Sequence, residues 1–185
     1  MQNVISTYKI IALKITTSIL SPKNFFLEFS LFKNKIIIHK SKQTSGLNWL
    51  TNNIKTAVYS CDVDNRPVAI TITKTKTTIK PKIIDDKVVT KTKIDVKIRT
   101  SDEASVSLEN KDYLEKIKKE ISSKIISECD SCAENVLYKN KTDMLNISRY
   151  LSLYEPYFFR NINRTINNII ESTSFEYEIK CSFDK

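Results

Sequence analysis

The residues of this chain with the clearest chemical potential are two cysteines three positions apart, Cys129 and Cys132. A redox-active Cys-x-x-Cys pair normally begins a helix, where the helix dipole lowers the pKa of a thiol. These two lie instead about four turns into a long helical pattern, on its apolar side. A free cysteine in the core behaves as a small hydrophobic side chain. The spacing therefore favours core packing, with a redox or metal-binding pair as the alternative.

Other residues that could take part in catalysis lack the partners that a reaction needs. His39, the one histidine, has no assignable nucleophile or acid beside it, which favours a structural histidine over a general base. Asp85 and Asp86 follow Pro81, where a turn with Asx-type hydrogen bonds is the simpler interpretation, since a divalent cation needs further oxygen ligands. A single glycine in 185 residues excludes phosphate loops and dinucleotide fingerprints. The sequence predicts no catalytic residue, no metal site and no cofactor.

The net charge allows an anionic partner without requiring one. The chain carries 30 Lys and Arg against 21 Asp and Glu, a formal charge of +9. Such an excess attracts an anionic membrane surface or nucleic acid. A lysine- and isoleucine-rich background composition also produces it, and we favour this interpretation. The lysines are spread along alternating stretches without interleaved aromatic residues for base stacking, so nucleic acid is the less favoured partner.

The N-terminal stretch Val4–Leu20 is apolar but is interrupted by Lys9 and Lys14. A membrane-spanning helix needs about 20 consecutive apolar residues, so we expect neither a transmembrane segment nor a secretory signal. No cysteine precedes Cys61, and a lipoprotein acylation site near the start is therefore not predicted. On these grounds we expect the chain itself not to be anchored. We interpret residues 1–24 as a lead-in or the remnant of a preceding domain.

The elements that position these residues follow from hydrophobic periodicity. Two β-rich runs, Phe25–Phe32 and Lys35–His39, flank Lys33-Asn34 and are typical of a hairpin. The only glycine, Gly46, comes next, and we expect there a backbone conformation that other residues avoid. From Val68 to Thr100, isoleucine, valine and threonine alternate with lysine. This alternation predicts strands with one buried face and one wet face.

A long helix follows, because apolar residues recur every three or four positions from Leu114 to Val136. Shorter helical patterns cover Met144–Leu153 and Pro156–Ile170. The strictly alternating segment Phe175–Phe183 predicts a last strand. The order strands, helices, strand predicts an α+β fold, in which helices pack on one face of a mostly antiparallel or mixed sheet.

Two aromatic features are compatible with either a core or a binding surface. Trp49, the single tryptophan, is by default a core anchor because so large a ring usually buries. Its alternative is a partner-facing hot spot. Five aromatic residues between Tyr150 and Phe159 allow the same two interpretations, with helix-on-sheet packing favoured. From the residues alone, the sequence predicts an α+β domain without an active site.

Several short motifs follow one another in a distinctive order. They are Phe32-Lys33-Asn34-Lys35 leading into an apolar strand, Gln43-Thr44-Ser45-Gly46 ahead of Trp49, the lysine-rich strands, Asp143-Met144-Leu145 after the long helix, Arg149-Tyr150-Leu151, Pro156 and the alternating last strand. In this order they resemble the C-terminal domain of the GerAC-type (Ger(x)C) spore germination proteins, over residues 25–185. The chain departs from that family where Gln43 and Ser45 replace a glutamate and an arginine, and where a tryptophan before the last strand is missing.

The resemblance implies a non-enzymatic component of a spore nutrient germinant receptor. Members of that family are lipid-anchored at the outer face of the spore inner membrane, beside two integral-membrane subunits. The C-terminal domain is then expected to act as a protein-interaction scaffold, with its basic sheet face against anionic lipid. An isolated or decayed copy of the domain and a nucleic-acid-binding module are the alternatives. The residues expected to take part in interaction are Gly46, Trp49, Asp143, Arg149 and Tyr150.

Overall fold

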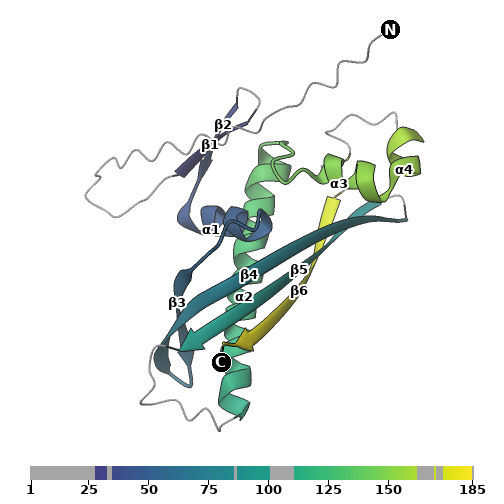
Figure 1. Cartoon of the computed structure of the whole chain (residues 1–185). Helices are drawn as coiled ribbons and strands as arrows, with labels where there is room; N and C mark the ends of the chain where they lie inside the picture. Colours follow the sequence, from purple (N-terminus) through teal and green to yellow (C-terminus); the bar gives the residue numbers. More distant parts are fainter. Residues whose placement is uncertain are drawn as a thin grey trace.

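The computed structural model describes residues 28–32, 35–85, 87–100, 111–161, 169 and 173–184, so the predicted lead-in 1–24 lies outside the described residues. Figure 1 shows a twisted sheet with one long helix behind it, and a hairpin and two short helices at one end. In chain order the elements are β1 (Glu28–Phe32), β2 (Lys35–His39), α1 (Ser41–Leu50), β3 (Ala57–Val63), β4 (Arg66–Ile84), β5 (Lys87–Thr100), α2 (Lys111–Ala133), the π-helical η1 (Glu134–Lys139), α3 (Ile147–Tyr154), α4 (Pro156–Asn161) and β6 (Thr173–Phe183).

The main sheet is mixed and has the strand order β3-β4-β5-β6. β3, β4 and β5 pair antiparallel, whereas β6 returns to pair with β5 in parallel. Alternate residues of β5, from Val88 to Ile98, are buried, as the alternation of apolar residues with lysine predicts. A register irregularity between Ile72 and Lys74 of β4 shifts the buried positions from even-numbered to odd-numbered residues. The lysines beyond it are even-numbered and therefore lie on the exposed face.

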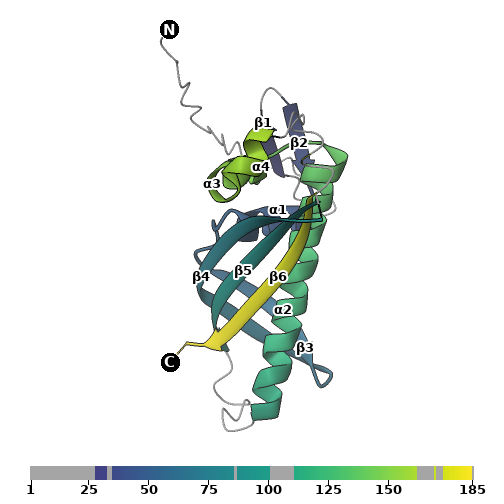
Figure 2. The ribbon, with the colours of Figure 1, turned by 90° about the vertical axis from the view of Figure 1, so that its right-hand side faces the viewer.

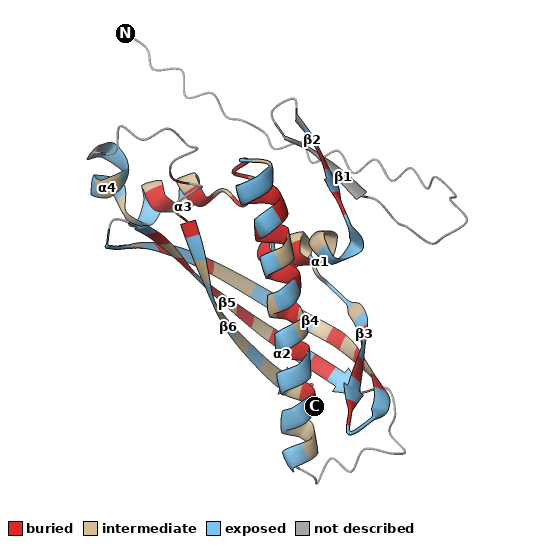
Figure 3. Cartoon of the chain, turned by 180° about the vertical axis from the view of Figure 1, so that it is seen from behind, coloured by how far each residue is buried: buried red, intermediate tan, exposed pale blue. Residues whose placement is uncertain are grey.

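The long helix α2 covers the buried face of this sheet, as seen from behind in Figure 3. Apolar residues recur at three- and four-residue spacing along one side of α2 and into η1, and the members of this stripe from Ile117 in α2 to Val136 in η1 are fully buried. They face the buried side of β4 and β5, where Ile70, Ile94 and Ile98 are also inaccessible to solvent. The predicted helical stripe is thus confirmed, and α2 and η1 together supply about a third of the core residues.

The predicted hairpin is confirmed as the separate two-stranded sheet β1-β2, with Phe32 opposite Lys35 at its turn. His39 at the end of β2 is buried, and its Nδ1 lies 3.3 Å from Nδ2 of Asn135 in η1. The same amide donates a hydrogen bond to the carbonyl oxygen of Ile38 at 3.1 Å. These contacts tie the hairpin to the end of the long helix and give His39 a structural role.

The predicted α+β class, with a mixed sheet and helices on one face, is confirmed. Two elements were not predicted: the helix α1 and the edge strand β3. The turn expected at Asp85 joins β4 to β5, and Asp85 takes a φ of 48° there, a conformation that aspartate tolerates in turns. The predicted helix Pro156–Ile170 is confirmed only for α4, because residues 162–168 lie outside the described part.

Candidate functional site

Trp49 lies at the centre of a buried polar network between α1, β3 and α2. The ring is fully buried, with 0% of its surface exposed. Its Nε1 donates to Oε2 of Glu128 at 2.9 Å and lies 3.2 Å from the hydroxyl oxygen of Tyr59. That hydroxyl donates to the same carboxylate oxygen at 2.8 Å. The network satisfies the three polar groups inside the core, so Trp49 acts as a core anchor.

Burial dominates the electrostatics of this network. It raises the pKa of the Glu128 carboxyl, although the hydrogen bonds from Tyr59 and Trp49 and the charge of Lys124 oppose that rise. The pKa of the Tyr59 hydroxyl is raised by burial and by the neighbouring Glu128 carboxylate. The Lys124 ammonium lies 5.2 Å from the centre of the Tyr59 ring, a cation–π distance. The Glu128 carboxyl of α2 accepts hydrogen bonds from Trp49 of α1 and Tyr59 of β3, and these bonds are suited to positioning the helices.

Gly46 has a different role from the one that the sequence predicts. It lies within α1, and no glycine of the described residues has a positive φ, so the expectation of a special backbone conformation is wrong. The reason for glycine is a close approach of α1 to α2. A Cβ at this position would lie 2.0 Å from the backbone oxygen of Glu128 and 2.7 Å from Cβ of Cys132. Only glycine lets the two helices pack this closely.

Cys129 and Cys132 lie in the same interface and are both fully buried. Burial raises the pKa of each thiol, that of Cys132 to about 12. A buried thiol with a raised pKa is protonated at neutral pH and is a poor nucleophile or metal ligand. The interpretation as core residues is therefore confirmed. No group of three or more potential metal ligands occurs in the described part of the chain.

Asp143 stabilises the beginning of α3. Its Oδ1 accepts a hydrogen bond from the backbone nitrogen of Ile147 at 2.6 Å, and its Oδ2 accepts one from that of Ser148 at 3.1 Å. The Ser148 hydroxyl also bonds to Oδ2. A carboxylate that accepts from the first backbone N–H groups of a helix is a helix cap. Asp143 is buried, and its contacts are those of a structural residue.

Arg149 and Tyr150 lie on α3 at the surface, where Arg149 is exposed and Tyr150 is half-buried. The Tyr150 ring stacks on that of Tyr154, with centroids 6.5 Å apart and planes at 18°. Four large apolar side chains on α3 and α4 remain exposed, with Leu153 at 65% and Tyr157 at 81%. We call this the α3–α4 surface; its members are Leu153, Tyr154, Tyr157 and Phe159.

The five predicted interaction candidates thus fall into two places. Gly46 and Trp49 are internal and pack α1 against α2. Asp143 caps the helix that carries Arg149 and Tyr150, and these three belong together at the α3–α4 end. The interaction role of Arg149 and Tyr150 stays a prediction. Tyr157 and Phe159 beside them are exposed, contrary to the core packing that the sequence favours for this aromatic group.

The outward face of the sheet carries the basic residues. On β5, Lys91 lies 3.5 Å from Glu176, and Lys93 lies 3.6 Å from Asp95. The lysines of β4 have no carboxylate within ion-pair distance among the described residues, and two of them stand opposite lysines of β5 in the register. Like charges directly opposite are destabilising in a sheet. We call these four exposed residues the β4 lysine row; they are Lys74, Lys76, Lys80 and Lys82.

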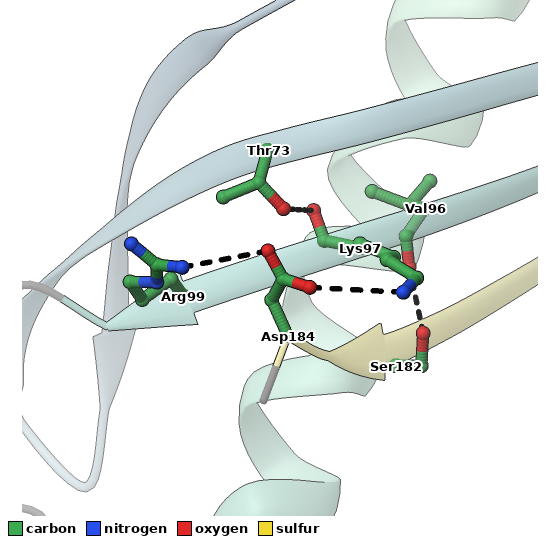
Figure 4. Close-up of polar contacts among 6 residues, drawn as sticks. All are labelled: Thr73, Val96, Lys97, Arg99, Ser182 and Asp184. Atoms are coloured by element: carbon green, nitrogen blue, oxygen red, sulfur yellow. Dashed lines mark hydrogen bonds and ion pairs between the residues drawn. The ribbon is translucent and has the colours of Figure 1, made fainter.

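Asp184 forms ion pairs with two basic side chains at the other end of β5 (Figure 4). It lies 3.6 Å from the Lys97 ammonium and 3.5 Å from the Arg99 guanidinium, and its backbone nitrogen donates to the Ile98 carbonyl at 2.8 Å. The Ser182 hydroxyl adds a long contact of 3.5 Å to the Val96 carbonyl. The exposed charge that is left on this face is therefore concentrated on β4.

Glu128 is the member of the buried network that the sequence did not predict. A signal was available, because Glu128 stands three residues after Ile125 and four before Cys132, in the apolar stripe of α2. An acid in such a stripe indicates a buried carboxylate with partners.

None of the described helices is long and apolar enough to cross a membrane.

A four-stranded mixed sheet covered by one long helix defines the fold class of this domain, and a solved structure shares it. The crystal structure of the GerBC protein matches with a TM-score of 0.73 over 86% of this chain and 50% of that chain. The sequence identity is 21%, so this likeness establishes the fold alone.

The sequence identifies the family. The family model described as Spore germination B3/GerAC like, C-terminal, matches residues 29–183, and the chain belongs to this family. Spore germination protein B3 of Bacillus subtilis (strain 168) is 24% identical over 149 residues, which cover 79% of this chain and 40% of that protein. The chain thus spans less than half the length of this relative. The family resemblance predicted from the ordered motifs is confirmed.

Proposed function

We propose that this chain is a non-enzymatic component of a spore nutrient germinant receptor and acts in it as a protein-interaction scaffold. Membership of the germination family supports the biological role. The proposed partners are the integral-membrane subunits of the receptor, at the outer face of the spore inner membrane. The chain corresponds to 40% of the length of its B3 relative, so the role of the whole relative is carried to this chain as a proposal.

The observation that carries the scaffold role is the α3–α4 surface. Four large apolar side chains are exposed on two helices that follow one another in the chain, and this exposure supports a surface that another molecule covers. Leu153 and Tyr157 lose the most by staying in water, since 65% and 81% of their surfaces are exposed. Arg149 precedes Leu153 by one helical turn and adds a cation beside the apolar group. Aromatic and arginine side chains together are enriched in protein interfaces.

The β4 lysine row supplies a second surface, which we propose to rest against anionic lipid headgroups. Each lysine near such a membrane contributes about 1 kcal/mol. Alternate residues of a strand are about 6.8 Å apart, so Lys74 and Lys76, and likewise Lys80 and Lys82, point the same way from a rigid element. The row carries no aromatic side chain for base stacking, which favours lipid over nucleic acid as its partner.

The test of the scaffold role is crosslinking of the tagged chain in sporulating cells, followed by identification of its neighbours. We expect receptor subunits among the products, and we expect them to disappear in a double variant, Leu153→Ser with Tyr157→Ser. The matched control is Val58→Ser, which removes an apolar side chain that is 73% exposed on β3. A double variant that crosslinks as efficiently as the control contradicts the role of the α3–α4 surface.

A further inference from the structure

β6 is the outermost strand of the main sheet on its side, and its second edge is free of any described strand. Figure 2 looks toward this side of the molecule. The Asp184 backbone nitrogen donates to Ile98 of β5 at 2.8 Å, which fixes the direction of the backbone groups. Because these groups alternate along a strand, even-numbered residues of β6 bond to β5. Odd-numbered residues, from Phe175 to Phe183, therefore present N–H and C=O groups to the free edge.

The side chains of the same odd-numbered residues form an incompletely covered apolar row. On β5 the alternate residues from Val88 to Ile98 are fully buried beneath α2. On β6 the corresponding residues are only half-buried, so that part of their apolar surface stays accessible. A further strand beside β6 would extend the sheet under this surface and bury it. The row consists of Phe175, Tyr177, Ile179, Cys181 and Phe183.

The edge also lacks several of the features that normally prevent strand addition. Proteins protect edge strands with proline, bulges, very short strands or charged side chains, lysine above all. β6 is 11 residues long, contains neither proline nor glycine, and pairs with β5 without a shift of register. Its charged residues all lie on the outward face, where Glu176 and Glu178 precede Lys180. Glu178 and Lys180 lie 3.0 Å apart on the same strand, and Glu176 lies 3.5 Å from Lys91 of β5. Because both signs are present and exposed, these charges select a partner strand by sign instead of excluding every partner.

We propose that a second copy of this chain pairs with β6 in antiparallel orientation, about a two-fold axis at Ile179. In this register Ile179 faces Ile179 of the other copy, and Glu178 faces Lys180 twice. Phe175 then lies opposite Phe183, so apolar residues meet on the face that α2 covers. The odd-numbered residues exchange about ten backbone hydrogen bonds, two for each closely bonded pair. Two four-stranded sheets become one continuous sheet.

The charges distinguish this register from its neighbours. An axis at Glu178 places the two Glu178 carboxylates opposite each other. An axis at Lys180 opposes the two lysines and also sets Glu176 against Asp184. Of these three axes, the one at Ile179 gives two attractive pairs and no like-charge pair, and directly opposed like charges are destabilising. An interface of this kind is isologous, with the same patch on both copies. The inference concerns β6 and is independent of the proposed function.

The first test is sedimentation velocity of the 185-residue chain over a wide range of concentrations. We expect a concentration-dependent monomer–dimer equilibrium. Glu178→Lys alone and Lys180→Glu alone each turn two attractive pairs into two repulsive ones, so each should weaken the dimer about tenfold or more. The double exchange, Glu178→Lys with Lys180→Glu, restores the pairs and should restore the dimer. A chain that stays monomeric at all concentrations, or a dimer that none of the variants weakens, overturns the proposal.

The second test reports the register directly and remains informative if a charge variant folds poorly. Closely bonded residues across an antiparallel pair have Cα atoms about 5.5 Å apart, within reach of a disulfide. In a Cys181→Ser background, Ile179→Cys should give a disulfide-linked dimer under mild oxidation. Glu178→Cys, as the matched control, faces Lys180 and should not. Equal crosslinking of both variants, or none with Ile179→Cys, contradicts the pairing; circular dichroism confirms that each variant is folded.

Discussion

Replacement of Gly46 by alanine tests the packing of α1 against α2 most sharply. The new methyl carbon would lie 2.0 Å from the backbone oxygen of Glu128 and 2.7 Å from Cβ of Cys132. The first of these atoms belongs to the backbone of a buried helix and cannot turn aside. The two helices must therefore separate by about 1 Å or more, because protein interiors are close-packed.

The expected cost follows from two opposing effects. Overpacking of a core costs about 1–3 kcal/mol, and a clash with backbone belongs at the upper end of that range. Alanine regains about 1 kcal/mol over glycine inside a helix. We therefore expect Gly46→Ala to lower the free energy of unfolding by about 2 kcal/mol, which is about 4–8 °C in Tm for a chain of this size.

The assay is thermal and urea unfolding followed by the fluorescence of Trp49, the single tryptophan. The indole lies within the affected interface, so its emission in the folded state should also shift to the red as Nε1 moves away from Glu128. Asn48→Ala in the same helix is the matched control and should leave stability unchanged or slightly increased. A Gly46→Ala variant that is as stable as the wild type would refute the close-approach argument.

Further predictions follow from the same structure. Burial raises the pKa of Glu128, so the folded state binds the proton of this carboxyl more tightly than the unfolded state does. This contribution to stability is lost as pH rises above about 4.5. Urea midpoints between pH 4 and 8 should therefore fall less steeply for Glu128→Gln than for the wild type, and equal slopes contradict the assignment. Asp143→Ala removes the side-chain hydrogen bonds at the start of α3 and should cost about 1 kcal/mol in urea unfolding, an effect that Asp143→Asn, which retains one of the two acceptor oxygens, should reduce only in part. A thiol reagent should leave Cys129 and Cys132 unmodified until denaturant is added, and rapid modification of the native protein would exclude their burial. Replacing the β4 lysine row by glutamine should weaken the affinity for phosphatidylglycerol vesicles, measured by co-sedimentation, by up to about 10³-fold. The same change at four exposed lysines elsewhere should have less effect; these are Lys55, Lys111, Lys119 and Lys139. Equal losses of affinity in the two variants argue against a specific face.

Sequence periodicity predicted those elements in which the local pattern of apolar residues itself determines which face is buried. The stripe of α2 and the alternation of β5 each repeat over more than ten residues, and each pattern admits one secondary structure. The helix α1 has only ten residues and contains Gly46 among polar neighbours. Its helical state depends on contact with α2, a tertiary effect that no local pattern carries.

Two further features depend on contacts between distant segments. The parallel pairing of β6 with β5 joins residues about 85 positions apart, and alternation alone does not indicate which strand is the neighbour or in which direction it runs. The fate of Trp49 depends on Glu128, which is 79 residues away. The sequence supplied the two residue types, but their proximity exists only in the folded chain. The exposure of Tyr157 likewise depends on how α4 is placed in the folded chain, which its own residues do not indicate.

Fractionation of sporulating cells that express the tagged native protein tests the scaffold role. After crosslinking, we expect recovery of the chain in the spore inner membrane, joined to receptor subunits through the α3–α4 surface. Recovery of a soluble product without receptor crosslinks would contradict the scaffold role. In that case the chain would retain the fold of its germination family without the function proposed for it.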